Sequence, residues 1–121
     1  MNYIVLDLEW NQSADGKAYT NSRIPFEIIQ IGAVKLDENF SEISQFDRYI
    51  RPAVYTKLHD KVQEILNVTI EELTCIGHDF TDVANDFIRW CGDDYIFCTW
   101  AQTDLTELQR NFDYYNIEYN F

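Results

Sequence analysis

Three stretches in the first part of the chain have the apolar, β-branched character of strands: Tyr3–Leu8, Glu27–Leu36 and Ile43–Ile50. The first is apolar at nearly every position, which is typical of a strand covered on both faces. The segment Ser13–Pro25 is polar and contains glycine and proline, so we expect a loop there. Pro52 ends the third stretch, because proline cannot continue a β-ladder. No helical pattern separates the three stretches, and they therefore predict an antiparallel meander.

Helical spacing of apolar residues begins after the third strand. A first short helix is predicted from apolar positions that share one face, at Leu58, Val62, Ile65 and Leu66. Thr69 can cap the turn that follows, and Glu72 stands in the capping-box position three residues later. We therefore expect a short helix followed by a capped turn in this part of the chain.

A fourth strand, Asp94–Trp100, is predicted between two amphipathic helices, Phe80–Trp90 and Asp104–Tyr115. The predicted order is then three strands, two helices, one strand and one helix. This order is typical of an α/β or α+β domain with a mixed sheet. The chain has 121 residues, 46% of them hydrophobic, which is enough for one such domain and too little for two.

The charge balance narrows the range of partners. The chain has 21 acidic and 9 basic residues, a formal net charge of -12 at pH 7. It would repel a bare polyanion, so a nucleic acid would have to be bound locally, through metal ions or a few placed side chains. Cys75, Cys91 and Cys98 have no zinc-type spacing and indicate buried, reduced thiols in a cytoplasmic protein. Without a basic leader or an apolar run of ~18 residues, we expect no membrane partner.

Two acidic residues, Asp7 and Glu9, stand at the end of the first apolar stretch. On a strand, residues two apart point to the same side, which places these carboxylates ~7 Å apart. Such a pair beside an apolar sheet is repulsive and poorly solvated, unless a divalent cation lies between the two groups. The alternative is that the strand ends at Leu6 and both acids are in solvent.

A third acid, Asp104, follows the fourth predicted strand at the first turn of the last helix. An acid at this position commonly caps a helix or complements its dipole. The surrounding sequence, YIFCTWAQTDLTELQRN, has a more particular form: a strand, a small residue, two polar residues, Asp, and then an amphipathic helix.

The sequence resembles the DEDD superfamily of 3′–5′ exonucleases, in its DnaQ-like (DEDDh) branch. IVLDLEW is similar to the first exonuclease motif, D-x-E at the end of the first strand. TWAQTD is similar to the second motif, usually W-G-x-x-D, with Ala101 in place of the glycine. Between them, PFEIIQIGAVKLDE and FDRYIRPAVYTKLHDKVQEILNVTIEEL are similar to the family's intervening segments, so the resemblance covers nearly the whole chain. Within the branch, the chain is most similar to the bacterial KapD-like and small-RNA-trimming exonucleases.

The resemblance implies a fold, a chemistry and a set of site residues. The fold is a ribonuclease-H-like mixed sheet, with three antiparallel strands, then a parallel fourth strand, flanked by helices. The chemistry is hydrolysis of phosphodiester bonds at the 3′ end of single-stranded DNA or RNA, with two Mg²⁺ or Mn²⁺ ions. Asp7 would bridge both ions, Glu9 would bind the ion on the nucleophile side, and Asp104 would complete the shell. Leu8 and Trp10 are the candidate substrate-binding residues, Trp10 through stacking on a base; a role for Trp10 in the core is equally compatible with its position.

The chain departs from the family pattern after Asp104. The branch has a third motif, H-x-x-x-x-D, which supplies a histidine general base and a fourth carboxylate. The two histidines here, His59 and His78, both precede Asp104, and neither fits that role. We therefore expect the first two thirds of an exonuclease domain, without the last strand and helices, with weak activity or none.

Such a truncation would leave an exposed edge, with uncovered hydrophobic residues such as Phe112, Tyr115 and Ile117. Through this edge we expect a homodimer or a domain swap.

Two other interpretations remain open at this point. One is a non-catalytic nucleic-acid or protein interaction module with the same fold, which would also lack the third motif. The other is a receiver-like phosphoacceptor domain, which has a similar length and an acidic Mg²⁺ pocket. The receiver family needs a late lysine, whereas the last lysine here is Lys61.

Overall fold

The computed structural model describes all residues from 1 to 121 and contains one four-stranded sheet. The strands are β1 (Asn2–Asn11), β2 (Glu27–Leu36), β3 (Glu42–Tyr49) and β4 (Tyr95–Thr99), in the spatial order β3-β2-β1-β4. The pairs β1–β2 and β2–β3 are antiparallel, and β4 runs parallel to β1. The expected mixed sheet is confirmed, as is the antiparallel meander of its first three strands.

Strand β1 is longer than predicted and runs through both acidic residues to Asn11. Asp7 pairs with Gly32 of β2 and Glu9 pairs with Gln30, so both acids lie within the ladder. The strand therefore does not end at Leu6, although Asp7 is exposed to solvent, as that alternative expected, and Glu9 is half-buried.

Four α-helices follow β3: α1 (Asp60–Leu66), α2 (Ile70–Ile76), α3 (Phe80–Cys91) and, after β4, α4 (Gln102–Tyr114). A single 3-10 turn, Lys17–Tyr19, lies within the first long loop. The chain has one helix more than the predicted order, because the segment expected as a capped turn continues as α2. The side of α1 predicted to be apolar is only partly correct, since Ile65 is 72% exposed.

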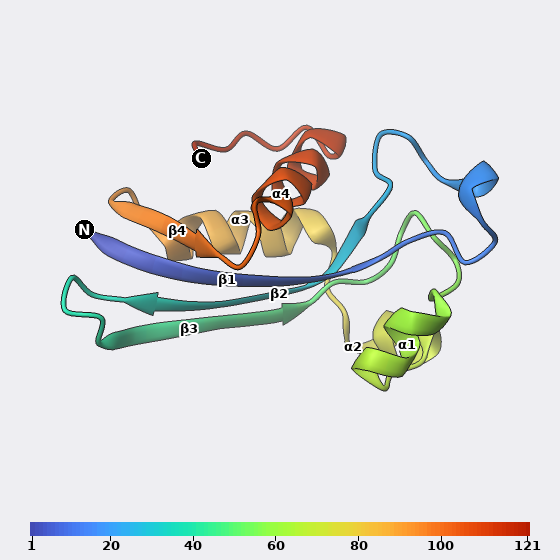
Figure 1. Ribbon diagram of the computed structural model, residues 1–121, viewed down its shortest axis with the longest axis horizontal. Helices are drawn as coiled ribbons and strands as arrows, with labels where there is room; N and C mark the ends of the chain where they lie inside the picture. Colours follow the sequence, from blue (N-terminus) through green and yellow to red (C-terminus); the bar gives the residue numbers. More distant parts are fainter.

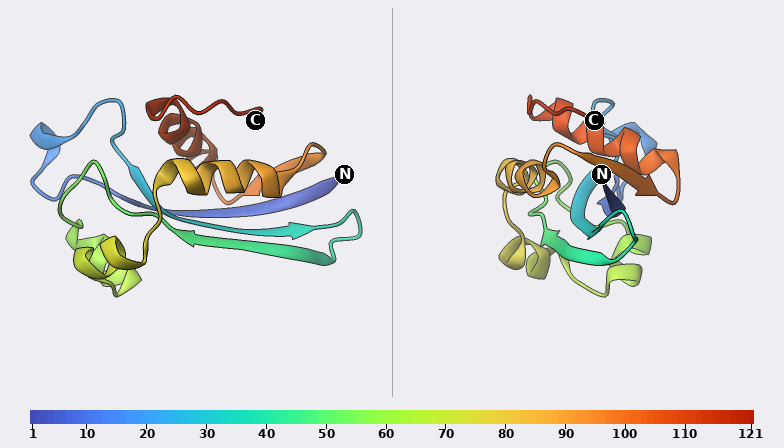
Figure 2. Two further views of the ribbon diagram at one scale, coloured as in Figure 1. Left: turned by 180° about the vertical axis from the view of Figure 1, so that it is seen from behind. Right: turned by 90° about the vertical axis from the view of Figure 1, so that its left-hand side faces the viewer.

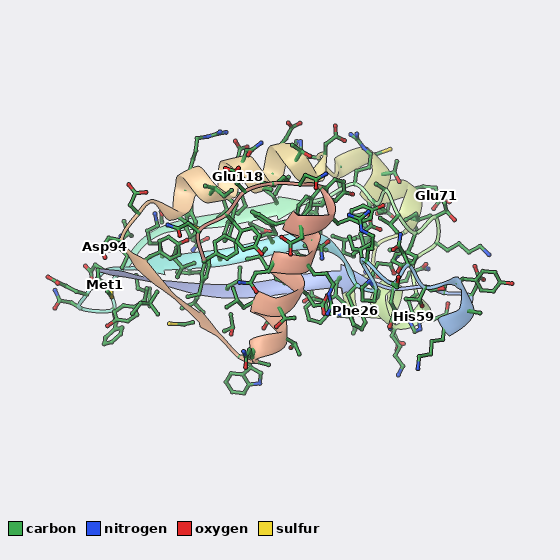
Figure 3. The ribbon with its side chains drawn as sticks, turned by 90° about the horizontal axis from the view of Figure 1, so that it is seen from above. Met1, Phe26, His59, Glu71, Asp94 and Glu118 are labelled. Atoms are coloured by element: carbon green, nitrogen blue, oxygen red, sulfur yellow. The ribbon has the colours of Figure 1, made fainter.

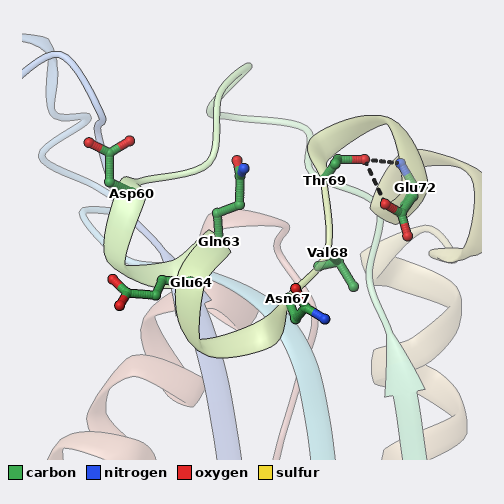
Figure 4. A pocket seen from close by; sticks show the side chains of 7 residues that line it. All are labelled: Asp60, Gln63, Glu64, Asn67, Val68, Thr69 and Glu72. Atoms are coloured by element: carbon green, nitrogen blue, oxygen red, sulfur yellow. Dashed lines mark hydrogen bonds between the residues drawn. The ribbon is translucent and has the colours of Figure 1, made fainter.

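The predicted cap of α2 forms between Thr69 and Glu72. The Glu72 amide donates to Thr69 Oγ1 at 3.1 Å, and the Thr69 hydroxyl lies 3.2 Å from Glu72 Oε1. Figure 4 shows this pair at the edge of a hollow between α1 and α2, which is lined mostly by polar and acidic side chains. The hollow is made by α1, α2 and the turn between them, so it is separate from the acids of β1.

Helices α3 and α4 both lie over one face of the sheet, as Figures 1 and 2 show from three directions. The main core forms between them, from alternate residues of β1 and from apolar residues of both helices: Ile4, Leu6, Leu8, Val83, Phe87, Leu108 and Phe112. The opposite face has no helix over β1 and β4, and Val5 and Ile96 there are 44% and 45% exposed. Asp7 belongs to this open face, because it alternates with the buried residues of β1.

A smaller apolar cluster lies where α1 and α2 meet the sheet, around Ile29, Leu58 and Leu73. No helix is both long enough and apolar enough to cross a membrane. The three cysteines are free thiols, as expected, but only Cys91 is buried, whereas Cys75 is exposed.

The C-terminal segment covers part of the core that was expected to be open. Phe112 is fully buried, and its ring packs edge-on against Tyr119 and Phe121 at 5.7 and 5.5 Å between centroids. Tyr115 and Ile117 are partly buried against the same core. The expectation that Phe112 would be uncovered is therefore wrong, because the last residues of the chain fold back over it.

Candidate metal and active site

The site forms where β1 extends beyond its parallel neighbour. Leu6 is the last residue of β1 to pair with β4, opposite Thr99 at the end of that strand. From Asp7 onward β1 has β2 on one side only. The chain turns at Trp100 and Ala101 and begins α4 at Gln102, so Asp104 lies in the first turn of a helix that starts beside this free edge.

Helix α4 crosses over the strands, as Figure 3 shows from above. Ala101 is the N-cap residue of α4, and the Asp104 amide donates to the Ala101 carbonyl at 3.3 Å. The Asp104 side chain is not solvated like an ordinary N-terminal acid, since the residue is only 9% exposed. A purely capping role does not explain this burial, because a capping or dipole-complementing acid works as well in solvent.

The three predicted acids influence one another. Burial raises the pKa of Glu9 above its usual value, and the negative charges of Asp7 and Asp104 raise it further. Burial also raises the pKa of Asp104, the charge of Asp7 adds to this, and the hydrogen bond at Ala101 opposes it. The charges of Asp7 and Asp104 thus act on Glu9, and that of Asp7 acts on Asp104, between β1 and α4. That the three acids form one site stays a prediction.

No cation of the protein itself relieves this repulsion. The five ion pairs in the structure involve other acidic groups, and none includes Asp7, Glu9 or Asp104. Nor does any group of three or more His, Cys, Asp or Glu side chains form a ready-made metal site. The donor set fits a hard divalent cation, which prefers carboxylate oxygens, but binding would have to draw the three side chains closer together.

The comparisons with known proteins give the family. A family model described as "Exonuclease" (RNase_T) matches residues 4–120. The chain belongs to this exonuclease family. No curated protein matches the chain in sequence.

Solved structures agree in fold at low sequence identity. The nuclease domain of 3'hExo, described as a DEDDh family member bound to rAMP, has a TM-score of 0.78 and 20% identity, over 98% of this chain and 62% of that one. The cell-death related nuclease CRN-4 has a TM-score of 0.76 and 21% identity, over 98% and 41%. E. coli exonuclease I, in complex with a dT13 oligonucleotide, has a TM-score of 0.73 and 17% identity, over 95% and 24%. The chain thus spans about a quarter to three fifths of the length of these three structures.

The comparisons and the sheet topology exclude one of the two interpretations left open by the sequence, the receiver-like domain, and leave the non-catalytic module open. The DnaQ-like exonuclease assignment and its ribonuclease-H-like fold are confirmed. A receiver-like domain is excluded, since such domains have a doubly wound parallel sheet and β2 here is antiparallel to both of its neighbours. The likeness to KapD-like enzymes, the truncation, and the dimer or domain swap stay predictions.

The two candidate substrate-binding residues of this exonuclease domain have different environments. The side chain of Leu8 is buried in the main core, so any contact with a substrate would come from its backbone. Trp10 is half-buried, and its ring lies 5.6 Å from that of Phe26, centroid to centroid. One side of Trp10 is thus used in packing, and its stacking on a base stays a prediction.

The two histidines lie at the start of α1 and between α2 and α3. His59 is the N-cap residue of α1, and its Nδ1 accepts a hydrogen bond from the Lys61 amide at 3.2 Å. His78 is exposed in the connection between α2 and α3, where its backbone forms a bridge with Ile50. That neither is the general base stays a prediction.

Two buried polar residues of α4 were missed by the sequence analysis. Glu107 and Asn111 are 6% and 0% exposed, and both lie on the helix face that carries Asp104. The sequence pattern that could have found them is their spacing of three and seven residues from Asp104, because residues at this spacing share one helical face. A polar residue on a face that also carries Leu108 and Phe112 indicates a specific partner inside the protein.

Proposed function

We propose that this chain carries the metal-binding part of a 3′–5′ exonuclease, which hydrolyses the terminal phosphodiester bond of single-stranded DNA or RNA. The observation that carries the proposal is that the charges of Asp7 and Asp104 act on Glu9 beside the free edge of β1, with the pKa values of Glu9 and Asp104 raised. Family membership supports the reaction class. Perturbed carboxylates near one another are typical of functional sites, and here they come from two of the sequence motifs that resemble those of the family.

Each acid has a proposed role that follows from its position. Asp7 raises the pKa of both other acids, so it is the natural shared ligand. Glu9 lies two residues further along β1, and Asp104 lies in the first turn of α4. When bound, two divalent ions would supply an activated water and stabilise the charge on the leaving 3′ oxygen.

Divalent ions bound to the three acids would also neutralise this part of the surface, so that a nucleic acid could bind to a chain with a net charge of -12. Trp10 and the backbone of Leu8 flank Glu9 and are the proposed contacts for the last nucleotide. Two of the structurally similar proteins are described with rAMP and with dT13, which supports a nucleotide or single-stranded ligand.

We further propose that these 121 residues hydrolyse substrate weakly by themselves. These 121 residues have no histidine after Asp104, and the imidazole of His59 is used as the N-cap of α1, while His78 lies between α2 and α3. A positioned general base commonly contributes on the order of 100- to 10,000-fold in rate, so its absence predicts slow turnover.

The experiment uses a single-stranded oligonucleotide labelled at its 5′ end, with the protein in excess and with Mn²⁺ or Mg²⁺. The expected product is a slowly forming ladder that loses one nucleotide at a time from the 3′ end, and that EDTA abolishes. Asp7→Asn removes a proposed ligand. Its matched control is Asp47→Asn, since Asp47 is an exposed acid on the same sheet face, two strands away. A ladder of equal strength from wild type and Asp7→Asn would disprove the proposed site, and rapid turnover in a second assay with the oligonucleotide in excess would disprove the weak activity.

A second candidate is a non-catalytic interaction module. The observation that favours it is that the three acids do not form a ready-made metal site. This candidate predicts that single-stranded oligonucleotides bind equally well with and without divalent ions, and equally well to wild type and Asp7→Asn. Fluorescence anisotropy with a 5′-labelled strand distinguishes the two candidates.

A further inference from the structure

Asn111 connects α4 to the start of β2 through its side-chain amide. The Asn111 Oδ1 accepts a hydrogen bond from the Ile28 amide at 3.0 Å, and its Nδ2 donates to the Phe26 carbonyl at 2.9 Å. The same Nδ2 lies 2.8 Å from the Glu107 carbonyl, one turn earlier in α4. Asn111 is fully buried, so its amide is held by these protein groups and not by solvent. Figure 3 shows Phe26 beside α4.

These bonds lie at an irregular point in the sheet. Glu9 pairs with Gln30, but the next residue of β1, Trp10, pairs with Ile28, so the register shifts by one residue between them. Ile29 is left without a partner in β1 and packs instead in the smaller cluster with Leu58 and Leu73. Asn111 therefore binds β2 next to the shift that follows Glu9.

The other contacts of α4 with the core are apolar, mainly through Leu108 and Phe112. Apolar contacts are not directional and allow a helix to slide or rotate, whereas a bidentate amide defines one position. Asp104 and Asn111 are seven residues apart, two turns on one face, which is about 10 Å along a rigid helix. The position of Asn111 on β2 thus determines the position of Asp104 relative to Glu9.

We propose that Asn111 is a positioning residue of the carboxylate site, which sets the place of Asp104 on α4 relative to Glu9 on β1. The effect of Asn111 on metal binding rests on the proposed function, whereas its effect on the position of Asp104 does not. Outer residues of this kind, which orient metal ligands without touching the metal, typically change metal affinity on the order of 10- to 100-fold when they are replaced.

The test compares Asn111→Leu, of similar size but unable to form either bond to β2, with a destabilised variant that leaves this link intact. Val83→Ala serves as that control, because Val83 is a buried residue of α3. Asn111→Ser, which also removes the two bonds but is smaller and polar, replaces the Leu variant if that one does not fold. Thermal unfolding shows how far the variants match in stability.

Two measurements are made on each folded variant. The first is Mn²⁺ affinity by titration calorimetry, where we expect the Asn111 variants to lose on the order of 10- to 100-fold and Val83→Ala to keep the wild-type value. The second is the NMR spectrum without metal, where we expect the amide signals of Glu9 and Asp104 to move in the Asn111 variants and to stay in Val83→Ala.

The outcomes separate this inference from the proposed function. Wild-type Mn²⁺ affinity and unchanged Glu9 and Asp104 signals in an Asn111 variant would overturn the positioning role, as would equal losses in Val83→Ala. If wild type itself binds no Mn²⁺, the metal site of the proposed function fails. The NMR comparison then still decides whether Asn111 positions Asp104.

Discussion

Leu6 of β1 lies opposite Thr99, the last residue of β4, and beyond this pair β1 has lost its parallel neighbour. Asp7 and Glu9 follow directly on β1, and α4 begins three residues after Thr99. The end of β4 therefore determines where Asp7 and Glu9 lose a neighbouring strand. It also determines where α4, the helix that carries Asp104, begins. Asp104 reaches the site because β4 stops there.

The first prediction is that Asp104→Asn has opposite effects on stability and on metal binding. Asp104 is nearly buried, and neither it nor Asp7 or Glu9 has a cation partner in the protein. Removing its charge should raise the free energy of unfolding without metal by about 0.5–2 kcal/mol, the usual gain from relieving a charge conflict. It should also remove a ligand and weaken Mn²⁺ binding.

Urea unfolding with and without Mn²⁺ measures both effects. Glu38→Gln, at an exposed acid in the turn between β2 and β3, is the control and should change neither quantity much. A loss of stability in metal-free Asp104→Asn would contradict the electrostatic conflict inferred here.

The second prediction concerns the pH dependence of stability. Glu9 and Asp104 have pKa values raised above their ordinary 4.5 and 3.8. A carboxyl group with a raised pKa in the folded state contributes stability that is fully present below its unfolded pKa, and this contribution is lost as the pH rises through the folded pKa. Without metal, stability should therefore contain a component that decreases from about pH 4 upward.

Divalent ions should reverse this component, because they bind the ionised carboxylates and only in the folded state. Melting temperatures between pH 4 and pH 8, with and without Mn²⁺, test this in wild type and in a Glu9→Gln, Asp104→Asn double variant. The double variant should lack both the decrease and the gain from Mn²⁺. If the melting temperatures of wild type and double variant depended on pH in the same way, Glu9 and Asp104 would not be the source of this component.

Strand β2 shows what the sequence could predict. Its predicted bounds, Glu27–Leu36, are those of the structure, because the stretch is apolar and β-branched and is closed by a turn at Asp37. The Asp37 carboxylate caps that turn by accepting hydrogen bonds from the amides of Asn39 and Ser41. Both signals depend only on residues that are close in sequence, so they can be recognised without knowledge of the tertiary structure.

Ile65 and Asn111 show where the prediction fails. The helix around Ile65 has only seven residues, about two turns, and so few positions do not define which side is buried. Asn111 bonds to backbone groups 83 and 85 residues away, and a backbone partner leaves no mark in the sequence. The resemblance to the exonuclease motifs predicts that Asp104 and Asp7 belong to one site, and this stays a prediction, whereas nothing in the sequence indicates the amide that holds α4 in place.

The third prediction is that Glu107→Gln stabilises the protein and leaves the site unchanged. Glu107 Oε1 accepts from Arg110 at 3.0 Å, but the buried Oε2 has no hydrogen-bond partner. Burial raises the pKa of Glu107, and Arg110 only partly opposes this. The same sign applies as for Glu9, so wild-type stability should decrease as the pH rises past this pKa, and Glu107→Gln should lack that decrease.

Thermal unfolding over the same range as above, pH 4 to pH 8, measures how stability depends on pH in both proteins, with Glu118→Gln as a control at an exposed acid. At neutral pH we expect Glu107→Gln to gain about 1 kcal/mol, since a buried and incompletely paired charge is removed. Mn²⁺ affinity should stay at the wild-type value. A marked loss of affinity would mean that Glu107 takes part in the site.

The fourth prediction concerns Glu27, the first residue of β2, whose buried carboxylate organises the loop before α1. Its Oε2 accepts hydrogen bonds from the amides of Ala53 and Val54 at 2.8 and 2.9 Å, and its Oε1 accepts from the Tyr55 amide at 3.2 Å. Burial raises the pKa of Glu27 in spite of these three bonds. Glu27→Ala would leave three amides without an acceptor, so it should lower the free energy of unfolding by about 3 kcal/mol or more.

Glu27→Gln should be less harmful, because its side-chain oxygen can replace Oε2 and keep the bonds to Ala53 and Val54. Only the Tyr55 amide would then face an NH₂ group, which cannot accept its hydrogen bond. Urea unfolding of both variants, with the exposed Glu38→Ala as control, gives the ranking wild type, Gln, Ala. Glu27→Ala with the stability of Glu38→Ala would show that the loop holds its shape without the carboxylate.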